Sequence, residues 1–354
     1  MQRVAYIVPS LAPLGPVIVV WNLVERMVAH GHECVVFYFD EREKGMVFPC
    51  ETRRISFWKK EDFSGFDWVH THCFRPMVYG ARVKGVRRMT TIHSYLFTEY
   101  RYSLGRCLGW LFGRFTMAVA TRYDVVAVLS EDAKQYYSQW IPEEKLRVCY
   151  NGVDIARAPS GAVTTLLTQD WQRVETFKGK GTLIGCICEL VKIKNLDVML
   201  HAMTLLPLEY KLLLIGSGAD EEKLQGLAER LGIRDRVLFL GYRYEAHRLL
   251  PLVDIYAMTS RSEGFCLALT EAAMYGKRIV CADIPGMREK FSDEEVTYFD
   301  VDSPQALAEA IVAAQQHEEK GRKAKAVALE RFSTEKMYEQ YEGGYDRLRQ
   351  QSCV

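Results

Sequence analysis

The chain has 354 residues, a length that favours two domains over one. Hydrophobic residues make up 49% and charged residues 26%, as in ordinary globular proteins with a well-formed core. The formal net charge of +1 argues against a general nucleic-acid binder, and the apolar runs are too short for a secretory signal or a bilayer-spanning helix.

The first forty residues predict the opening of a parallel α/β sheet. A strand at 4–8 is followed by a loop rich in proline and glycine, then by a helix over 17–30 and a strand at 35–39. Ligands of such sheets bind at the carboxyl ends of the strands. Gly15, in the loop after the first strand, is therefore a candidate ligand contact.

Two further predicted strands end in histidines. Residues 67–72 read Asp-Trp-Val-His-Thr-His, and residues 89–94 read Met-Thr-Thr-Ile-His-Ser. A single histidine is more often structural than functional. His70, His72 and His93 thus stand at or just beyond the carboxyl ends of these two predicted strands.

The segment 75–122 is strongly basic, with Glu99 as its one acid. Its basic residues are Arg75, Arg82, Lys84, Arg87, Arg88, Arg101, Arg106, Arg114 and Arg122. Aromatic and aliphatic residues are interleaved with them, a mixture that suits an anionic membrane surface or a phospholipid-linked acceptor. Two other interpretations are a core helix with a basic outer face and a nucleic-acid contact, for which nothing else in the chain speaks.

Residues 124–154 contribute a buried strand, a helix capped by Ser130 and a strand that ends in Asn-Gly-Val-Asp. The following stretch, 155–181, is weakly periodic and contains proline and several glycines, which predicts an interdomain linker. We therefore expect a first domain over 1–165 and a second over 175–334.

The second domain opens with a strand at 182–188. Cys186 and Cys188 alternate along it, and without a second pair or a nearby histidine they are weak evidence for zinc, so free thiols in the cytoplasm are expected. A strand at 210–215 leads into Gly216-Ser-Gly218. The third glycine of a dinucleotide motif is missing, which favours a tight turn near a ligand over NAD binding.

The stretch 259–276 carries the most informative pattern. Glu263 precedes Gly264 in a predicted loop, and a helix begins at Leu267, contains Glu271 and ends at Gly276. The amides of Phe265, Cys266 and Leu267 would lie unpaired at the helix start, where an anion is favoured. Two acids around an anion site suit a sugar that is joined to a diphosphate and a ribose.

These residues resemble a known signature. Ser-Arg-Ser-Glu-Gly-Phe over 260–265, Glu-Ala-Ala-Met-Tyr-Gly over 271–276, Ile-Val-Cys-Ala-Asp-Ile-Pro-Gly over 279–286 and Glu289 are similar to the family-4 glycosyltransferases. The resemblance implies the GT-B fold, an α/β fold in which two Rossmann-like parallel-sheet domains face each other across a cleft. It also implies an acceptor-side first domain, a donor-binding second domain, and a terminal helix at about 335–354 that packs back on the first domain.

The resemblance further implies roles for individual residues. Lys194 would neutralise the leaving diphosphate, Glu263 would hold the sugar, and His93 would contact the sugar from the first domain. Glu271 would accept the ribose hydroxyls. The other donor-binding positions are Gly15, Gly216, Tyr242, Arg243, Gly264, Phe265, Cys266 and Leu267.

Two positions depart from the family pattern. Leu14-Gly15-Pro16 stands where paired glycines are usual, and Glu189 stands where an arginine is expected beside the lysine. A carboxylate would repel a phosphate at short range. Either Arg261 or Arg243 substitutes for that arginine, or Glu189 points away, or the donor differs.

The expected function is retaining transfer of a sugar from a nucleotide diphosphate, with UDP as the nucleotide, to an acceptor hydroxyl. The acceptor would be a carbohydrate or lipid-linked molecule of cell-surface polysaccharide or glycolipid synthesis, with no cofactor and no metal. The protein would be cytoplasmic, with the basic segment as a contact to the inner face of the membrane. The alternatives are a catalytically degenerate nucleotide-sugar-binding partner protein and a GT-B nucleotide-sugar epimerase.

Overall fold

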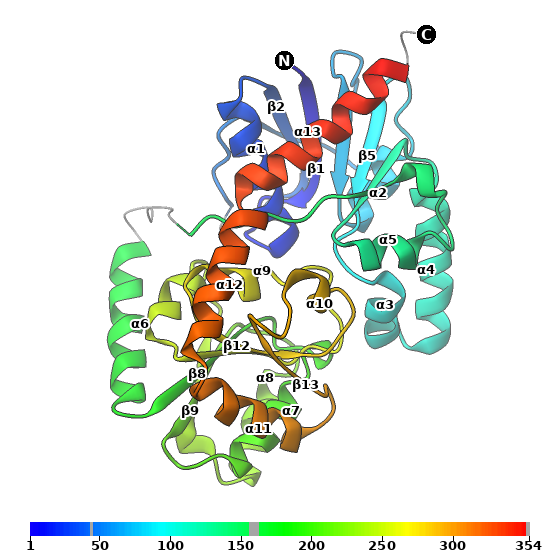
Figure 1. Ribbon diagram of the computed structural model, residues 1–354. Helices are drawn as coiled ribbons and strands as arrows, with labels where there is room; N and C mark the ends of the chain where they lie inside the picture. Colours follow the sequence, from blue (N-terminus) through cyan, green and yellow to red (C-terminus); the bar gives the residue numbers. More distant parts are fainter. Residues whose placement is uncertain (43–44, 156–162, 352–354) are drawn as a thin grey trace. The chain divides into compact units, whose positions relative to one another are not determined.

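The computed structural model describes residues 1–42, 45–155 and 163–351 (Figure 1). The chain divides into two compact units, residues Met1–Val153 with Phe332–Val354, and residues Asp154–Arg331. Each unit is built around its own parallel sheet. In the part of the chain that the structure describes, every helix is too short or too polar to traverse a lipid bilayer.

The described part of the first unit contains a seven-stranded sheet in the order β3-β2-β1-β4-β5-β6-β7. All its strand pairs are parallel. The order reverses between β1 and β4, so the chain leaves these two neighbours in opposite directions and a crevice opens at their carboxyl ends. The strands are β1 Arg3–Ser10, β2 Glu33–Asp40, β3 Glu51–Arg54, β4 Trp68–His72, β5 Arg87–Thr91, β6 Val125–Val128 and β7 Leu146–Val148.

The helices of this unit are α1 Gly15–Ala29, α2 Phe74–Gly80, α3 Leu96–Leu104, α4 Arg106–Ala120, α5 Glu131–Tyr137 and α13 Thr334–Gln351, with a 3₁₀ turn, η1, at Glu143–Lys145. Most of these helices bury an apolar face, whereas α3 has no buried residue. Ser130 accepts a hydrogen bond from the amide of Ala133, so its predicted role as the cap of α5 is confirmed. Gly15, which we expected in the loop, is the first residue of α1.

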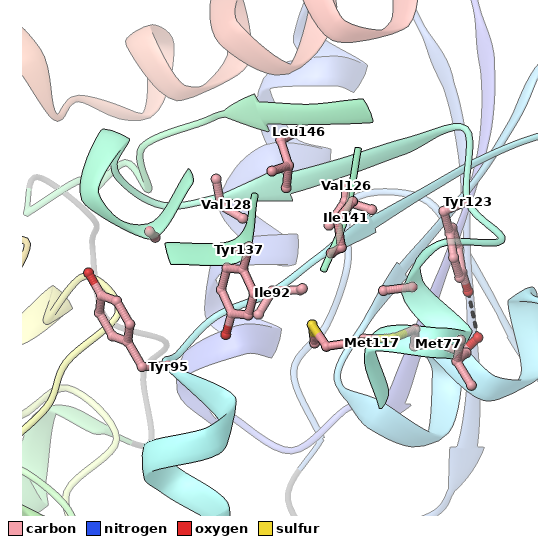
Figure 2. Packing of buried hydrophobic residues seen from close by; sticks show 13 residues of the cluster. Met77, Ile92, Tyr95, Met117, Tyr123, Val126, Val128, Tyr137, Ile141 and Leu146 are labelled. Atoms are coloured by element: carbon pink, nitrogen blue, oxygen red, sulfur yellow. Dashed lines mark hydrogen bonds between the residues drawn. The ribbon is translucent and has the colours of Figure 1, made fainter. Parts of the chain in front are cut away.

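One core cluster of the first unit joins α2 and α4 to strands β6 and β7 (Figure 2). Tyr123 is fully buried, and its hydroxyl donates a 2.6 Å hydrogen bond to the carbonyl of Met77. Met117 packs into the same cluster from α4. A buried tyrosine needs such a partner because an unpaired hydroxyl in an apolar core is costly.

The terminal helix α13 belongs to the first unit. Arg26 of α1 donates to the hydroxyl of Thr334, and the side chains of Tyr341 and Tyr345 are fully buried. Where the chain returns, Gly152 lies so close to Ser333 that a Cβ on the glycine would meet the Ser333 carbonyl oxygen at 2.5 Å. A larger residue at this crossing would force the two segments apart.

The second unit repeats the plan with six strands among its described residues, in the order β10-β9-β8-β11-β12-β13. The order reverses between β8 and β11, which places a second crevice at the carboxyl ends of that pair. The strands are β8 Thr182–Ile187, β9 Tyr210–Ile215, β10 Val237–Gly241, β11 Ile255–Met258, β12 Arg278–Ala282 and β13 Thr297–Phe299.

The helical elements of this unit follow the strands in turn. The α-helices are α6 Val163–Lys178, α7 Leu196–Leu205, α8 Glu221–Arg230, α9 Leu267–Met274, α10 Met287–Lys290, α11 Pro304–Gln315 and α12 Glu318–Arg331. The 3₁₀ turns are η2 Lys192–Lys194, η3 Arg234–Arg236 and η4 Ala246–Leu252.

The predicted linker over 155–181 is wrong for much of its length. Residues 156–162 lie outside the described part of the chain, and residues from 163 form helix α6. The helix is attached at its end, where the Lys178 ammonium donates to Asp254 at 2.7 Å and to the Leu252 carbonyl at 2.8 Å. Val174 is buried, and the helix has few such apolar positions. Its periodic signal was therefore weak in the sequence.

Candidate active site

Two of the three residues predicted to be catalytic meet at the crevice of the second unit. Lys194 lies at the end of η2, after β8, and Glu263 lies in the loop after β11. The Lys194 Nζ donates to Glu263 Oε1 at 2.6 Å. The reversal of strand order between β8 and β11 accounts for this meeting, since residues far apart in sequence leave adjacent strand ends.

Backbone contacts fix the two loops against each other. The Thr259 hydroxyl donates to the carbonyl of Lys194 at 2.7 Å. The amide of Arg261 donates to the carbonyl of Ile193 at 2.8 Å. The position of the lysine is therefore set by the loop that carries the glutamate, which favours a preorganised site.

The Lys194–Glu263 ion pair is mostly screened from solvent. The two side chains are 20% and 12% exposed. Ser260 donates a second hydrogen bond, of 2.6 Å, to the same Glu263 Oε1. Burial alone would lower the pKa of Lys194, but the adjacent Glu263 carboxylate raises that pKa above its ordinary value, so the ammonium stays charged.

The start of helix α9 lies close to this pair. The helix begins at Leu267, as predicted, and Gly276, which was expected to end it, lies two residues beyond its last helical residue with a left-handed backbone of φ +70°. Neither the Cys266 nor the Leu267 amide donates to a carbonyl in the described residues. Free amides at a helix N-terminus attract phosphate or carboxylate oxygens.

Cys266 caps α9 in an unusual conformation. Its φ of +59° lies in the left-handed region, which residues with a side chain adopt at a cost. Burial raises the pKa of its thiol to about 12, so the thiol is protonated and is no nucleophile at neutral pH. The backbone of Cys266, rather than its sulfur, is the part suited to bind a ligand.

Glu271 lies one turn inside α9 and is partly buried. In the described residues its side-chain carboxyl has no hydrogen-bond or ion-pair partner, although its backbone carbonyl accepts from the Tyr275 amide at 3.0 Å. Desolvation raises the pKa of its carboxyl from 4.5 to about 7. A buried carboxyl without a partner destabilises the ligand-free protein, and such groups concentrate in functional sites.

The glycines of the β9 loop are required by close backbone approach. Gly216 has φ +149°, and a Cβ there would lie 1.8 Å from the Cys188 carbonyl oxygen. Its amide donates to the Gly241 carbonyl at 3.0 Å. Gly216 thus lets the ends of β8, β9 and β10 lie close together, next to the segment that leads from β8 to Lys194.

The two residues that follow β10, Tyr242 and Arg243, lie in different environments. Tyr242 is 49% exposed. The Arg243 guanidinium forms a two-pronged ion pair with the carboxylate of Asp170 in α6 and also donates to the Tyr242 carbonyl at 2.9 Å. Because Asp170 already holds Arg243, that arginine is a poor substitute for the arginine that the family pattern expects at Glu189.

Arg261 is also engaged within the second unit. Its guanidinium forms an ion pair with Asp302 at 2.9 Å, and its Nη1 approaches the Lys192 carbonyl at 3.4 Å. Glu189 itself is exposed directly after β8. In the ligand-free site, Lys194 is thus the cation bound directly to the predicted catalytic glutamate.

Sequence reasoning missed Lys290, in α10. Its side chain is buried at 1% exposure, and its ammonium donates to the Phe265 carbonyl at 2.5 Å and to the Thr270 hydroxyl at 2.8 Å. Burial lowers the pKa of Lys290 to about 7. The lysine fixes the loop that leads into α9. A lone lysine beside Glu289 carried no sequence signal for this role, because only the fold brings it under residues 265–270.

The remaining predicted site residues belong to the first unit. Gly15 starts α1, and a Cβ on it would meet nothing within 4 Å, so packing does not require glycine there. His93 lies two residues beyond β5, and its Nε2 is 2.9 Å from Nδ1 of His72. His93 is partly exposed, whereas His72 is fully buried.

Helix α13 contacts His70, whose ring packs against His72 with ring centroids 4.2 Å apart. The Tyr345 hydroxyl lies 2.7 Å from Nδ1 of His70, and Nε2 of His70 lies 2.8 Å from the Thr91 hydroxyl. Burial lowers the pKa of His93 to about 4, so the ring is neutral at physiological pH. A neutral imidazole can position a hydroxyl but carries no charge to balance a phosphate.

No group of three or more histidine, cysteine, aspartate or glutamate side chains in the described residues is arranged to hold a metal ion. Beside the Glu263 carboxylate lie the Lys194 ammonium and the backbone amides at the start of α9.

Comparison with known families identifies the chain. Residues 168–331 match the family described as glycosyl transferases group 1, and residues 15–157 match glycosyltransferase family 4. The chain belongs to the group 1 glycosyltransferases. The resemblance drawn from residues 259–289 is thereby confirmed, and the protein is an enzyme of sugar transfer.

Two relatives show what this glycosyltransferase is similar to in sequence. The O-antigen biosynthesis glycosyltransferase WclY of Escherichia coli is 28% identical over 360 residues, which cover 98% of this chain and 99% of that protein. A second relative is an N-acetylgalactosaminyltransferase of Campylobacter jejuni whose name gives a diphospho-undecaprenol-linked saccharide as acceptor. It is 27% identical over 166 residues, covering 47% of this chain and 42% of that protein.

Solved structures establish the fold of the glycosyltransferase. Anabaena Alr3699/HepE in complex with UDP and glucose superposes with a TM-score of 0.80 at 18% identity, covering 98% of this chain and 100% of that one. WaaG, a glycosyltransferase of lipopolysaccharide biosynthesis, gives a TM-score of 0.69 at 16% identity, with 97% and 98% covered. With two parallel-sheet units in the chain, this likeness confirms the predicted GT-B fold.

Proposed function

We propose that this glycosyltransferase transfers a sugar from a nucleotide diphosphate to an acceptor hydroxyl with retention of anomeric configuration. The observation that carries the proposal is the Lys194–Glu263 ion pair beside the start of α9, with the unpaired Glu271 one turn further along. One small region of the second unit thus offers a cation, an anion cradle and two carboxyl groups. Retention rests on the family resemblance alone.

In the proposed reaction the bond between the anomeric carbon and the diphosphate oxygen breaks, and its electron pair stays on the diphosphate. The acceptor oxygen forms the new bond to that carbon, and its proton passes to the departing phosphate. The difficult step is the growth of negative charge on the leaving group while the sugar becomes cationic. Catalysis therefore requires fixed positive groups at the diphosphate.

The second-unit residues match these demands. The Lys194 ammonium and the amides of Cys266 and Leu267 would stabilise the diphosphate, so that the phosphate competes with Glu263 for the lysine. Glu263 would then be released to bind sugar hydroxyls and to balance positive charge on the ring. Glu271 would accept the two ribose hydroxyls, as a carboxylate can.

His93 and Gly15 enter the proposal from the first unit. The neutral ring of His93, held by His72, would hydrogen-bond to a sugar hydroxyl. Gly15 opens α1, where a small residue lets a phosphate approach the helix start. These two roles come from the resemblance and are independent of the charges at Lys194.

The names of similar proteins guide the choice of substrates. The Anabaena structure contains UDP and glucose, the E. coli relative acts in O-antigen biosynthesis, and the C. jejuni relative has an undecaprenol-linked acceptor. We propose a UDP-sugar donor, a carbohydrate or lipid-linked acceptor, and a role in cell-surface polysaccharide synthesis on the cytoplasmic side of the membrane.

A panel of nucleotide sugars tests this proposal. A true donor should raise the melting temperature because it binds the folded state by mass action. Turnover of that donor with a lipid-linked saccharide, followed by NMR of the new linkage, should show the anomeric configuration of the donor. Inversion at the anomeric carbon, or a panel with no stabilising member, would contradict the proposal.

Glu189 favours a second candidate function. In it, a catalytically degenerate transferase binds a nucleotide sugar and acts through a partner protein. The residue is exposed at a position where the family pattern expects an arginine. Hydrolysis of the stabilising nucleotide sugar separates the two functions. A donor that binds but is never hydrolysed or transferred would favour the degenerate protein.

A further inference from the structure

Helices α3 and α4 form a closely packed hairpin at one edge of the first unit (Figure 1). Gly105, with φ +80°, joins them. A Cβ on Gly109 would lie 2.6 Å from the backbone of Tyr100, and one on Gly113 would lie 2.5 Å from a side-chain carbon of Phe97. Glycines four positions apart thus let α4 approach α3 closely and fix which face of α4 is turned away.

The inner face of α4 is buried in the first unit. Its buried positions include both glycines and Thr116, and Met117 reaches the core cluster beside Tyr123 (Figure 2). No residue of α3 is buried, so α3 lies on the surface. The hairpin is therefore attached along one side, and its other side is left to solvent.

The outer face of α4 is apolar. Leu108 is 64% exposed, Leu111 is 61% exposed and Phe115 is 51% exposed, and their spacing of three and four residues places them on one side of the helix. Trp110 of α4 is 60% exposed, and Leu104, the last residue of α3, is 44% exposed. Soluble monomers seldom leave such a contiguous apolar stripe uncovered, and those that do use it for binding.

The same hairpin carries uncompensated positive charge. Arg101, Arg106 and Arg114 are exposed, and none of them forms an ion pair in the described residues. The Arg114 guanidinium lies 6.0 Å from the ring centroid of Trp110, so charge and apolar surface adjoin. Glu99 is the only acid over 96–120, and it accepts a hydrogen bond from Ser94.

We propose that the α3–α4 hairpin docks on an anionic lipid bilayer. The leucines, Trp110 and Phe115 would enter the boundary between headgroups and acyl chains, while the arginines would contact lipid phosphates. A second copy of the chain would bring like charges together across the contact, which disfavours a dimer through this face. Nucleic acid would leave the leucine stripe without a role.

This inference goes beyond the proposed reaction, because docking requires neither donor nor acceptor. It accounts for three of the nine basic residues of segment 75–122, Arg101, Arg106 and Arg114, which lie on the same hairpin as the apolar row. It also leaves both helices in the interface plane, since neither spans a bilayer.

Flotation of the full chain with vesicles tests the inference. We expect co-flotation with phosphatidylglycerol-containing vesicles, little with pure phosphatidylcholine, and weakening by salt. A single charge near the surface changes binding by about fivefold. The triple variant Arg101→Glu, Arg106→Glu, Arg114→Glu should therefore lose binding about a hundredfold or more. Leu108→Ser with Leu111→Ser should lose on the order of tenfold.

Matched variants on exposed positions of the second unit serve as controls. Lys180→Glu, Lys223→Glu and Arg230→Glu change the net charge equally, and Leu208→Ser with Leu329→Ser removes exposed leucines. Both controls should float like the wild type. Thermal melts should show that all variants fold.

Three results would overturn the inference. The wild type could remain unbound by anionic vesicles, or the hairpin variants could float as well as the controls do. In the third case, light scattering would show a dimer that the hairpin leucine variant dissociates, without vesicle binding, and the occupant would be a second copy. Failure in any of these ways leaves the proposed sugar transfer untouched, since none of the measurements includes a donor.

Discussion

Glu271 and Glu263 should respond in opposite directions to the same isosteric substitution. Glu271 is partly buried, and its side-chain carboxyl has no hydrogen-bond or ion-pair partner among the described residues. Glu263 is held by the Lys194 ammonium and the Ser260 hydroxyl at 2.6 Å each. Glutamine keeps the size of each side chain and removes only its charge. Comparison of the two glutamine variants therefore distinguishes a carboxyl that is reserved for a ligand from one that stabilises the ligand-free fold.

The magnitude for Glu271 follows from its pKa. Desolvation raises that pKa from 4.5 to about 7 in the folded state. A group whose pKa is raised in the folded state stabilises the protein when the pH is below its unfolded-state pKa. This stability is lost as the pH rises through its folded-state pKa. The desolvated Glu271 carboxylate therefore lowers the free energy of unfolding by about 3 kcal/mol at about pH 8 and by less than about 1 kcal/mol at about pH 5. Residual solvent exposure reduces the larger figure to about 1–3 kcal/mol.

Urea unfolding of the ligand-free protein measures the effect. At about pH 8, Glu271→Gln should be more stable than wild type by about 1–3 kcal/mol, and the gain should shrink towards pH 5. Glu263→Gln should be less stable by about 1–3 kcal/mol, because it leaves the Lys194 ammonium without its counter-charge. A Glu271→Gln variant that is less stable than wild type at pH 8, or a gain that does not change with pH, would refute the reasoning.

Three further changes probe other parts of the account. Lys194→Ala should reduce kcat by about a hundredfold or more in a donor-turnover assay, since it removes the charge proposed to stabilise the leaving diphosphate; unchanged kcat would exclude that role. Lys290→Met should lower stability by about 1–3 kcal/mol through loss of the two ammonium hydrogen bonds. Because the folded pKa of Lys290 is lowered to about 7, wild-type stability should rise with pH from 7 towards 10, and the variant should lose this contribution in urea titrations. Tyr345→Phe removes the hydroxyl that contacts Tyr6 and His70, so stability should fall by about 1 kcal/mol while UDP affinity stays unchanged; a wild-type melting curve would contradict this.

Sequence reasoning identified the features that depend on local order. The start of α9 at Leu267, the glycine after its end and the Ser130 cap follow from patterns within a few residues, and the structure confirms them. The meeting of Lys194 and Glu263 was predicted only through the family resemblance. Its physical basis, the reversal of strand order between β8 and β11, is a property of the whole sheet.

Features that depend on distant partners escaped the sequence. Lys290 is buried under the loop of Phe265 by tertiary packing, and nothing near it in the chain marks it as unusual. The sequence of helix α6 predicts a linker because its few apolar positions give a weak period, yet the Lys178–Asp254 ion pair attaches the helix to the second unit. In both cases, contacts far along the chain decide the structure.

The same limit applies to the basic segment of the first unit. Its composition indicated a membrane contact, a core helix or nucleic acid without deciding among them. The structure shows that α4 has both a buried face, at Gly109 and Gly113, and an exposed apolar one, at Leu108 and Leu111. Composition cannot separate these faces, because only the packing against α3 and the core shows which residues remain outside.

The most direct test of the central claim is calorimetric titration of UDP into the full chain, with Glu271→Gln as the variant and Glu222→Gln, on the exposed face of α8, as the control. The wild type and the control should bind UDP equally. Glu271→Gln should bind at least about tenfold more weakly, because a carboxamide has one acceptor oxygen where the ribose needs two. Equal UDP affinity in all three proteins, or no UDP binding by the wild type, would show that the crevice at β8 and β11 is not the donor site.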